Sequence, residues 1–320
     1  PSAESIPNMS HHNRTRGLAL AAIGGLALSF DIPLIRLSGG DVWSVQFVRG
    51  LMIAPIGVIA WLLARRFAGW TEPLMPGRLS LPIAFFYALS SALFFFAVFN
   101  TSTANLVFIL AFNPMIAALF GWALMKERPA AQTFLAMAAM LFGVFVIVKD
   151  GLAAGHWQGD FAALLSAASI AVAITLSRKS GRNHGFTVMM AQIGPVLISL
   201  PFIASQGVNV PDMGWMMLNG MLFLPLAFFC LAAAPRFIGA AESAMFYLLE
   251  TVLAPVWVWF VFAEKPTENA LIGGGILLAA LVLFVRGRLR VDVTAVLVLL
   301  SLVIAGILEP AQALAGFSSE

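Results

Sequence analysis

Four ionisable side chains lie deep inside apolar stretches of this sequence: Asp31, Arg49, Glu242 and Glu250. An ionisable group in a membrane-crossing segment is costly, by at least about 2.5 kcal/mol, so its side chain faces protein or a water-filled cavity. A carboxylate in such a cavity can bind an ammonium group or a proton, and a guanidinium can bind a carboxylate. These residues are therefore the first candidates for a binding site.

Each of the four also has a structural interpretation. Glu250 could make a hydrogen bond between helices, and Arg49 could form an ion pair that locks its segment. For these two residues both interpretations remain open. Glu242 lies near a predicted helix start, where an acid complements the helix dipole, and Asp31 precedes Ile32-Pro33, where it could satisfy the end of a broken helix. For these two we favour the structural role.

The spacing of polar residues links two segments. Glu242 and Glu250 are eight residues apart, which is about 80° around a helix and about 12 Å along it. Asn105 and Asn113 have the same spacing, at an offset of 137 residues from the glutamates. Equivalent polar faces predict that both helices line a common centre. All four residues are therefore candidates for substrate binding, although the structural role stays favoured for Glu242.

The uncharged candidates are less distinctive. Tyr87 and Tyr247 are the only two tyrosines, each inside an apolar segment with a hydroxyl that needs a partner. Ser91 lies in a phenylalanine-rich segment, which suits either an apolar cavity or ordinary packing. Gln46 and Trp43 begin another segment and could lie at the rim of a site, although for Trp43 an anchoring role at the membrane interface is favoured.

The hydrophobic composition of the chain indicates that the helices that position these residues lie in a membrane. Of 320 residues, 61% are hydrophobic and 10% are charged, against about 25% charged in soluble domains. A soluble fold is excluded, and nucleic acid is not an expected partner, because the basic residues lie in short gaps between apolar blocks despite the net charge of +3. The single Cys230 excludes an intrachain disulfide, and no cofactor or metal site is predicted.

We predict an all-α integral membrane protein with ten membrane-crossing helices. The apolar segments are 17–37, 42–64, 79–99, 101–125, 130–148, 161–176, 186–205, 215–234, 238–262 and 270–285. Fourteen basic residues fall on the side of the N-terminus and three on the other, so the N-terminal tail 1–16 is predicted to be cytoplasmic and no signal peptide is expected. The hydrophobic segment and tail 291–320 contain a further apolar run, 293–308, which could cross the membrane, lie in the interface or be a tail.

Two internal matches predict an inverted repeat. Glu127-Arg128-Pro129 matches Glu264-Lys265-Pro266 at the offset of 137, and Ser38-Gly39 matches Ser180-Gly181 at an offset of 142. Each pair is five predicted helices apart, and five is odd, so its members lie on opposite faces of the membrane. The chain is therefore predicted to consist of two five-helix repeats, 17–149 and 150–290, in inverted orientation.

The fourth and ninth segments carry the most specific motifs. They contain Thr101-Ser102-Thr103-Ala104-Asn105, Asn113-Pro114, Gly121-Trp122 and Lys126-Glu127-Arg128, and then Ala241-Glu242, Glu250 and Ala254-Pro255. Together with Phe47-Val48-Arg49 and Gly159-Asp160, this pattern resembles the EamA-type family of the drug/metabolite transporter superfamily. The pattern departs from the family at Thr251, where many members have proline, and at Lys126 and Ala263, which replace glycine.

The resemblance implies a ten-helix carrier that moves small metabolites outward through a central cavity. Its phenylalanine-rich third helix is similar to the amino-acid exporter branch represented by YddG. We therefore expect a monomeric multi-pass carrier of the inner membrane that exports amino acids, including aromatic or other apolar ones, and is not an enzyme. The alternatives are an integral membrane enzyme, for which no acid-base or metal motif is visible, a passive scaffold, and an exporter of another metabolite or drug.

Overall fold

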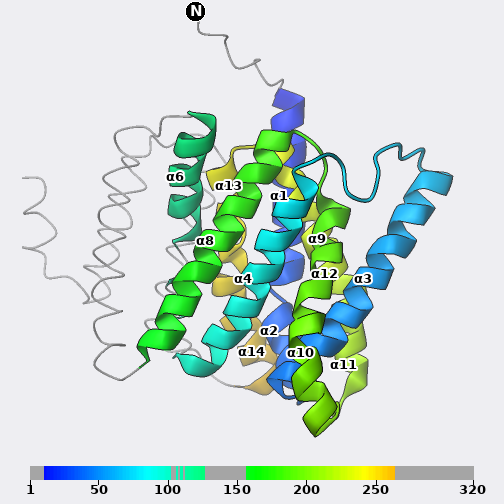
Figure 1. Ribbon diagram of the computed structural model, residues 1–320, viewed down its shortest axis with the longest axis vertical. Coiled ribbons are helices and arrows are strands. Elements are labelled where there is room, and N and C mark those ends of the chain that lie inside the picture. The colour runs from blue at the N-terminus through cyan, green and yellow to red at the C-terminus, as the bar shows by residue number, and fades with distance from the viewer. Residues whose placement is uncertain (1–10, 102–105, 107–108, 111, 127–155, 264–320) are drawn as a thin grey trace, which may run out of the picture.

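The structure is a computed structural model that describes residues 11–101, 106, 109–110, 112–126 and 156–263 (Figure 1). In these residues all regular secondary structure is helical. The α-helices are α1 (His11–Leu28), α2 (Asp31–Ser38), α3 (Val42–Phe67), α4 (Ser80–Asn100), α6 (Asn113–Met125), α8 (Trp157–Ser180), α9 (Gly185–Ala191), α10 (Ile193–Gln206), α11 (Met213–Leu218), α12 (Leu224–Ala233), α13 (Ala240–Met245) and α14 (Leu248–Phe262). A π-helical segment, Asn219–Phe223, joins α11 to α12, and a 3-10 turn, Ala234–Arg236, follows α12.

Six helical stretches of the described residues are long and apolar enough to cross a membrane. They are Asn13–Ser38, Val42–Phe67, Ser80–Val98, Trp157–Ser180, Gly185–Gln206 and Met213–Arg236. Large apolar side chains such as Leu81, Phe85 and Leu197 are exposed on the outside of the bundle, as expected for a surface that contacts lipid. The predicted segments 130–148 and 270–285 and the apolar run 293–308 lie outside the described residues, so the ten-helix inverted repeat stays a prediction.

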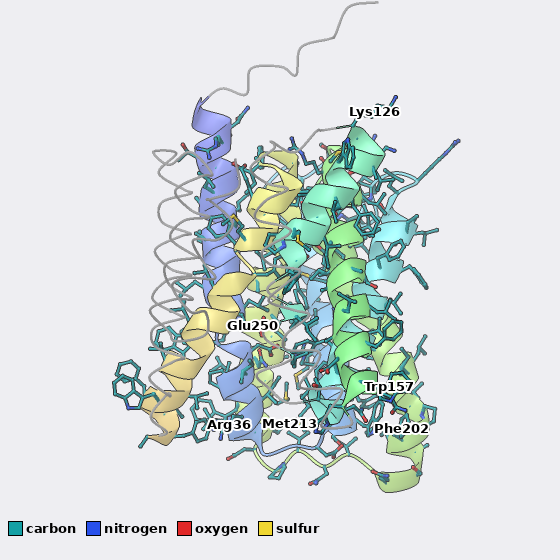
Figure 2. All side chains as sticks on the ribbon, turned by 90° about the vertical axis from the view of Figure 1, so that its left-hand side faces the viewer. Arg36, Lys126, Trp157, Phe202, Met213 and Glu250 are labelled. Atoms are coloured by element: carbon teal, nitrogen blue, oxygen red, sulfur yellow. The ribbon has the colours of Figure 1, made fainter. Side chains whose placement is uncertain are left out.

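Basic residues gather at one end of the bundle. The last turn of α3 contains Arg65 and Arg66, and the last turn of α8 contains Arg178 and Lys179. Both turns lie at the end marked by Lys126, and Arg36 lies at the opposite end (Figures 1 and 2). We call these the Lys126 end and the Arg36 end. The placement agrees with the predicted asymmetry of basic residues across the membrane.

Helix pairs from distant parts of the chain form the body of the bundle. Of the described elements, α4 packs most extensively against α8, followed by α1 against α12 and α3 against α10. Between α4 and α8, the Ser90 hydroxyl donates to the Ser166 carbonyl oxygen at 3.0 Å, and the Ser166 hydroxyl donates to the Ser90 carbonyl oxygen at 2.8 Å. Each of these three pairs joins a helix of the predicted first repeat to one of the second.

Four of the apolar segments contain a helix start or a helix break in their interior. The first breaks at Ser29-Phe30, the seventh at Gln192 and the ninth at Phe246-Tyr247, and α6 begins at Asn113 inside the fourth. Proline follows three of these positions, as Pro33, Pro114 and Pro195. Since proline cannot donate the helical hydrogen bond to the preceding turn, it favours an interruption of the helix there. The prediction of a broken helix beside Asp31 is therefore confirmed.

One break is held against α1 by a glycine. A Cβ atom added to Gly25 would lie 2.4 Å from the Phe246 carbonyl oxygen, a distance at which no side chain fits. A Cβ atom added to the neighbouring Gly24 would lie 2.8 Å from the Leu231 side chain and 3.0 Å from that of Cys230, both in α12. The lack of a side chain at Gly24 and Gly25 permits this close approach of the helices. It brings the α13–α14 break to α1 at the level of the α1–α2 break.

Backbone contacts join loops at the Arg36 end. The amide of Asp41 donates to the Asn209 carbonyl oxygen at 3.3 Å, and the amide of Asp212 donates to the Ser38 carbonyl oxygen at 3.0 Å. The Ser44 hydroxyl accepts from the amide of Asn209 at 2.8 Å. The connection after α2 and the connection after α10 are therefore fastened to each other.

Candidate functional site

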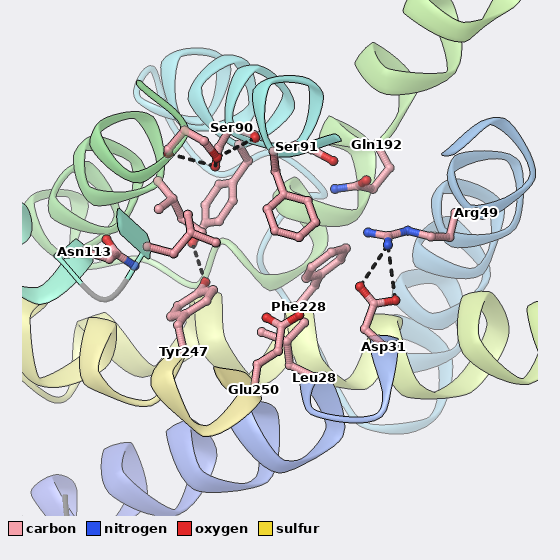
Figure 3. A pocket seen from close by; sticks show the side chains of 15 residues that line it. Leu28, Asp31, Arg49, Ser90, Ser91, Asn113, Gln192, Phe228, Tyr247 and Glu250 are labelled. Atoms are coloured by element: carbon pink, nitrogen blue, oxygen red, sulfur yellow. Dashed lines mark hydrogen bonds and ion pairs between the residues drawn. The ribbon is translucent and has the colours of Figure 1, made fainter. Parts of the chain in front are cut away.

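A cavity of about 120 Å³ lies at the level of the helix breaks. Glu250 marks this level, roughly halfway between the two ends of the bundle (Figure 2). The polar lining residues are Asp31, Arg49, Tyr87, Ser90, Ser91, Asn113, Ser166, Gln192, Tyr247 and Glu250, and the apolar ones are Leu28, Phe94, Leu110, Ile170 and Phe228 (Figure 3). The volume is below the range of about 300–1,000 Å³ for drug-sized ligands and therefore fits a small metabolite.

The helix breaks place much of the polar lining. Asp31 is the first residue of α2, Asn113 is the first residue of α6, and Glu250 lies in the first turn of α14. Gln192 is the break itself between α9 and α10. Irregular backbone inside a membrane is tolerated where it lines a cavity, and helix starts there present partly positive ends to a ligand. The helix breaks therefore form part of the cavity wall.

Arg49 and Asp31 form a buried ion pair on one side of the cavity. Nη1 of Arg49 donates to both carboxylate oxygens of Asp31, at 3.2 Å and 2.9 Å, and both side chains are 6% exposed. Asn219, which begins the π-helical segment, donates to Oδ1 of Asp31 at 2.7 Å. The Arg49 guanidinium also lies 5.0 Å from the centre of the Phe95 ring. Asp31 therefore begins the helix after the break, but its carboxylate does not cap that helix. It pairs with Arg49 and Asn219 and lines the cavity.

The two tyrosines meet at another wall. Their hydroxyl oxygens lie 3.4 Å apart, within hydrogen-bond distance, and bridge α4 to the break between α13 and α14. Tyr87 is 5% exposed, and Tyr247 is partly buried. The sequence predicted that each tyrosine hydroxyl needs a hydrogen-bond partner, and in the structure that partner is the hydroxyl of the other tyrosine.

Two polar groups of the lining have no partner among the described residues. The Oδ1 atom of Asn113 is buried and accepts no hydrogen bond from them. The carboxylate of Glu250 lies beside Leu28 and Phe228 in Figure 3 and accepts none from any side chain that the structure describes. A buried acceptor without a donor costs about 1–3 kcal/mol, and more when it is charged. Both groups are therefore available to a ligand.

The structure brings most of the predicted site residues together. Six of them line the cavity: Arg49, Tyr87, Ser91, Asn113, Tyr247 and Glu250. Asn105 lies outside the described residues. Their role in binding stays a prediction, which the shared cavity supports.

Three predicted site residues lie elsewhere. Glu242 accepts from the backbone amide of Gly239 at 3.0 Å and from Arg14 at 3.1 Å, and so serves the start of α13. Gln46 donates to Ser199 at 3.2 Å and to the carbonyl oxygen of Pro195, which ties α3 to α10.

Trp43 stacks on Phe202 with ring centres 3.8 Å apart, near the Arg36 end, where Figure 2 places Phe202. This position suits the anchoring role that the sequence favoured. Gln46 and Trp43 lie one and two turns from Arg49 on α3, and only Arg49 reaches the cavity.

Sequence reasoning missed Gln192, Ser90 and Asn219. Gln192 is 3% exposed and lines the cavity, and a signal for it existed. It stands three residues before Pro195 inside an apolar segment, much as Asp31 stands two residues before Pro33. No local pattern marks Asn219, because its role depends on Asp31 from a helix far away in the chain.

Comparisons with known proteins agree with this architecture. Residues 157–286 match the model of the EamA-like transporter family. An "Uncharacterized transporter" of Archaeoglobus fulgidus is 25% identical over 270 residues, covering 83% of this chain and 95% of that protein. The "Uncharacterized transporter YdfC" of Bacillus subtilis is 25% identical over 236 residues, covering 68% of this chain and 75% of its own length.

A solved crystal structure has the same fold. It superimposes with a TM-score of 0.66 at 16% sequence identity and covers 87% of this chain and 99% of its own. At this identity the likeness concerns the fold alone. The resemblance to the EamA-type family is thus supported for the second half of the chain, and nothing in these comparisons singles out the amino-acid exporter branch.

Proposed function

We propose that this protein is a secondary transporter of the inner membrane that exports amino acids or related small metabolites through the central cavity by alternating access. The observation that carries the proposal is a mid-membrane cavity formed at helix breaks and lined by Glu250 and Asn113, which have no partner among the described residues. Carriers of repeated architecture bind substrate in such a place. The EamA-like match and the transporter relatives support the class and favour it over an enzyme.

In this proposal Glu250 binds the substrate ammonium group. Asn113 and Gln192 offer hydrogen bonds to the polar part of the substrate, and Phe94, Phe228 and Ile170 contact its apolar part. The Lys126 end is the cytoplasmic end in this proposal, because it holds the basic residues at the ends of α3 and α8. In this proposal the protein works as a monomer.

Counterflow in proteoliposomes tests the proposal. A carrier exchanges labelled solute without altering it, an enzyme alters it, and a scaffold does neither. We expect exchange of labelled amino acids by the wild type, loss of at least about tenfold in exchange rate for Glu250→Gln and Asn113→Ala, and near-normal exchange for the control Glu242→Gln.

Two results would overturn parts of the proposal. Normal flux and affinity in both cavity variants would remove the site assignment. Transport of other metabolites without transport of any amino acid would remove the substrate assignment while leaving the carrier in place.

A further inference from the structure

The charges of the cavity do not balance. Asp31 and Glu250 contribute two carboxylates and Arg49 contributes one guanidinium, so the charged groups among the described lining residues sum to one negative charge. A net charge at this depth is costly, by at least about 2.5 kcal/mol on insertion scales. One further positive charge would make the cavity neutral.

The ion pair leaves Glu250 as the unbalanced acid. The Asp31 carboxylate accepts two hydrogen bonds from Arg49 and a third from Asn219, the last at 2.7 Å. Because the Arg49 guanidinium is already paired with the Asp31 carboxylate, it can attract a substrate carboxylate only weakly. Glu250 accepts no hydrogen bond from any described side chain. The start of α14 favours its charge, and that effect is worth about 0.3–1 kcal/mol.

No other described residue that lines the cavity supplies the missing charge. Asp31 from α2 and Arg49 from α3 face it as a pair, and Tyr87 from α4 and Tyr247 before α14 carry neutral hydroxyls at physiological pH. The described lining that α1 and α12 contribute is Leu28 and Phe228, which are apolar. The described lining therefore leaves the charge of Glu250 to be neutralised by a bound ligand or by a proton.

We propose that the cavity accepts one positive charge at a time, either the ammonium group of an amine substrate that carries no carboxylate or a proton on Glu250. Binding is then an exchange: the Glu250 O–H bond breaks, the proton leaves to water, and the carboxylate pairs with the R–NH3⁺ group. Both occupied states are neutral. A zwitterionic amino acid restores no charge, because its carboxylate cancels its ammonium group. This inference rests on the proposed carrier function. Among the amino acids and related small metabolites proposed there, it makes monocationic amines with an apolar body the preferred substrates and amino acids the weaker ones.

Binding measurements in detergent compare molecules that differ by one carboxylate. We use 2-phenylethylamine against phenylalanine, and 3-methylbutylamine against leucine, so that side-chain size is matched within each pair. The amine is expected to bind the wild-type protein at least about tenfold more tightly than its amino acid. Equal or tighter binding of the amino acids in both pairs, or no binding of either amine, overturns the inference.

Proton release provides the second measurement. In weakly buffered solution near pH 6 with a pH indicator, wild-type protein is expected to release about one proton for each amine bound. Glu250→Gln is expected to release none and to lose the preference for amines. The control Glu242→Gln, whose carboxylate lies in the contact with Arg14 and Gly239, keeps both properties. Binding without proton release, or release that persists in Glu250→Gln, overturns the inference.

These results separate the inference from the carrier function. Counterflow of labelled amino acids together with amine binding that releases no proton overturns the charge exchange and leaves the carrier standing. Amine binding with proton release but no counterflow of any solute overturns the carrier and leaves the charge exchange standing.

Discussion

The hydroxyl oxygens of Tyr87 and Tyr247 lie 3.4 Å apart and connect the two predicted repeats of the chain across the cavity wall. Tyr87 comes from α4, and Tyr247 lies in the break between α13 and α14, directly before the first residue of α14. A movement that opens the cavity between α4 and α14 must separate these two hydroxyls. The contact is thus a direct measure of whether that side of the cavity is closed.

Removing either tyrosine hydroxyl should have the same effect. Tyr87→Phe and Tyr247→Phe each delete the one bond that they share, and a hydrogen bond contributes about 1 kcal/mol, or about fivefold in an equilibrium constant. We expect a change of a few-fold in the half-saturation concentration for each variant, measured by counterflow. The double variant should be no worse than either single one. Additive losses would show that each hydroxyl acts separately, for example on the substrate.

The buried ion pair predicts an unequal response to single and double substitution. Arg49→Met leaves the Asp31 carboxylate without its main partner, which costs about 3–5 kcal/mol in buried sites. Replacing both residues, as Asp31→Asn with Arg49→Met, leaves no unpaired charge and should recover part of the thermal stability in detergent. A double variant less stable than Arg49→Met would contradict the pairing.

A single methyl group at Gly25 should disturb the helix break that it contacts. The Cβ of Gly25→Ala would meet the Phe246 carbonyl oxygen, and overpacking of this kind costs about 1–3 kcal/mol. We expect a lower melting temperature and weaker substrate binding, since Glu250 lies in the first turn of the helix after that break. Gly121→Ala is the matched control, because its Cβ would find only the end of Met125 at 3.8 Å. Equal behaviour of the two variants would disprove the role of the close approach.

Acid should weaken the connection between α8 and α9. Burial lowers the pKa of His184 from its ordinary 6.5 to about 4, with repulsion from Arg182 as a second cause. Its ring nitrogen lies 2.6 Å from the Ser180 hydroxyl. Between pH 6.5 and pH 4 the unfolded chain therefore binds a proton that the folded protein does not, so stability is full above about pH 6.5 and falls toward pH 4.

Melting curves across this pH range test the role of His184. His184→Gln should flatten the pH dependence between pH 6.5 and pH 4, while the exposed His156, substituted in the same way, should leave it unchanged. An unaltered slope in His184→Gln would assign the acid sensitivity to other groups.

The sequence predicted the membrane class and most of the cavity because burial of polar groups in lipid is costly. That cost left few candidates, and Glu250, Asn113, Arg49 and the two tyrosines all line one cavity. Proline marked three of the broken or interrupted helices in advance. These inferences needed only local patterns and the solvent.

What the sequence could not show depends on contacts between distant residues. Gln46 differs from Arg49 only by its position on α3, which turns it toward Ser199 instead of the cavity. Glu242 shares a predicted face with Glu250, yet the helix breaks between them at Phe246-Tyr247, so a continuous helix was the wrong geometry for that pair. Asn219 became visible only through its bond to Asp31.

The reciprocal hydrogen bonds between Ser90 and Ser166 limit how α4 and α8 can move relative to each other. α4 packs against α8, α1 against α12 and α3 against α10. The helices of the two halves therefore contact each other in pairs. Among the described helices, the most extensive contacts of each half are with the other half. Separating the predicted repeats as rigid bodies would break the contacts of all three helix pairs, whereas bending at the helix breaks would leave them in place.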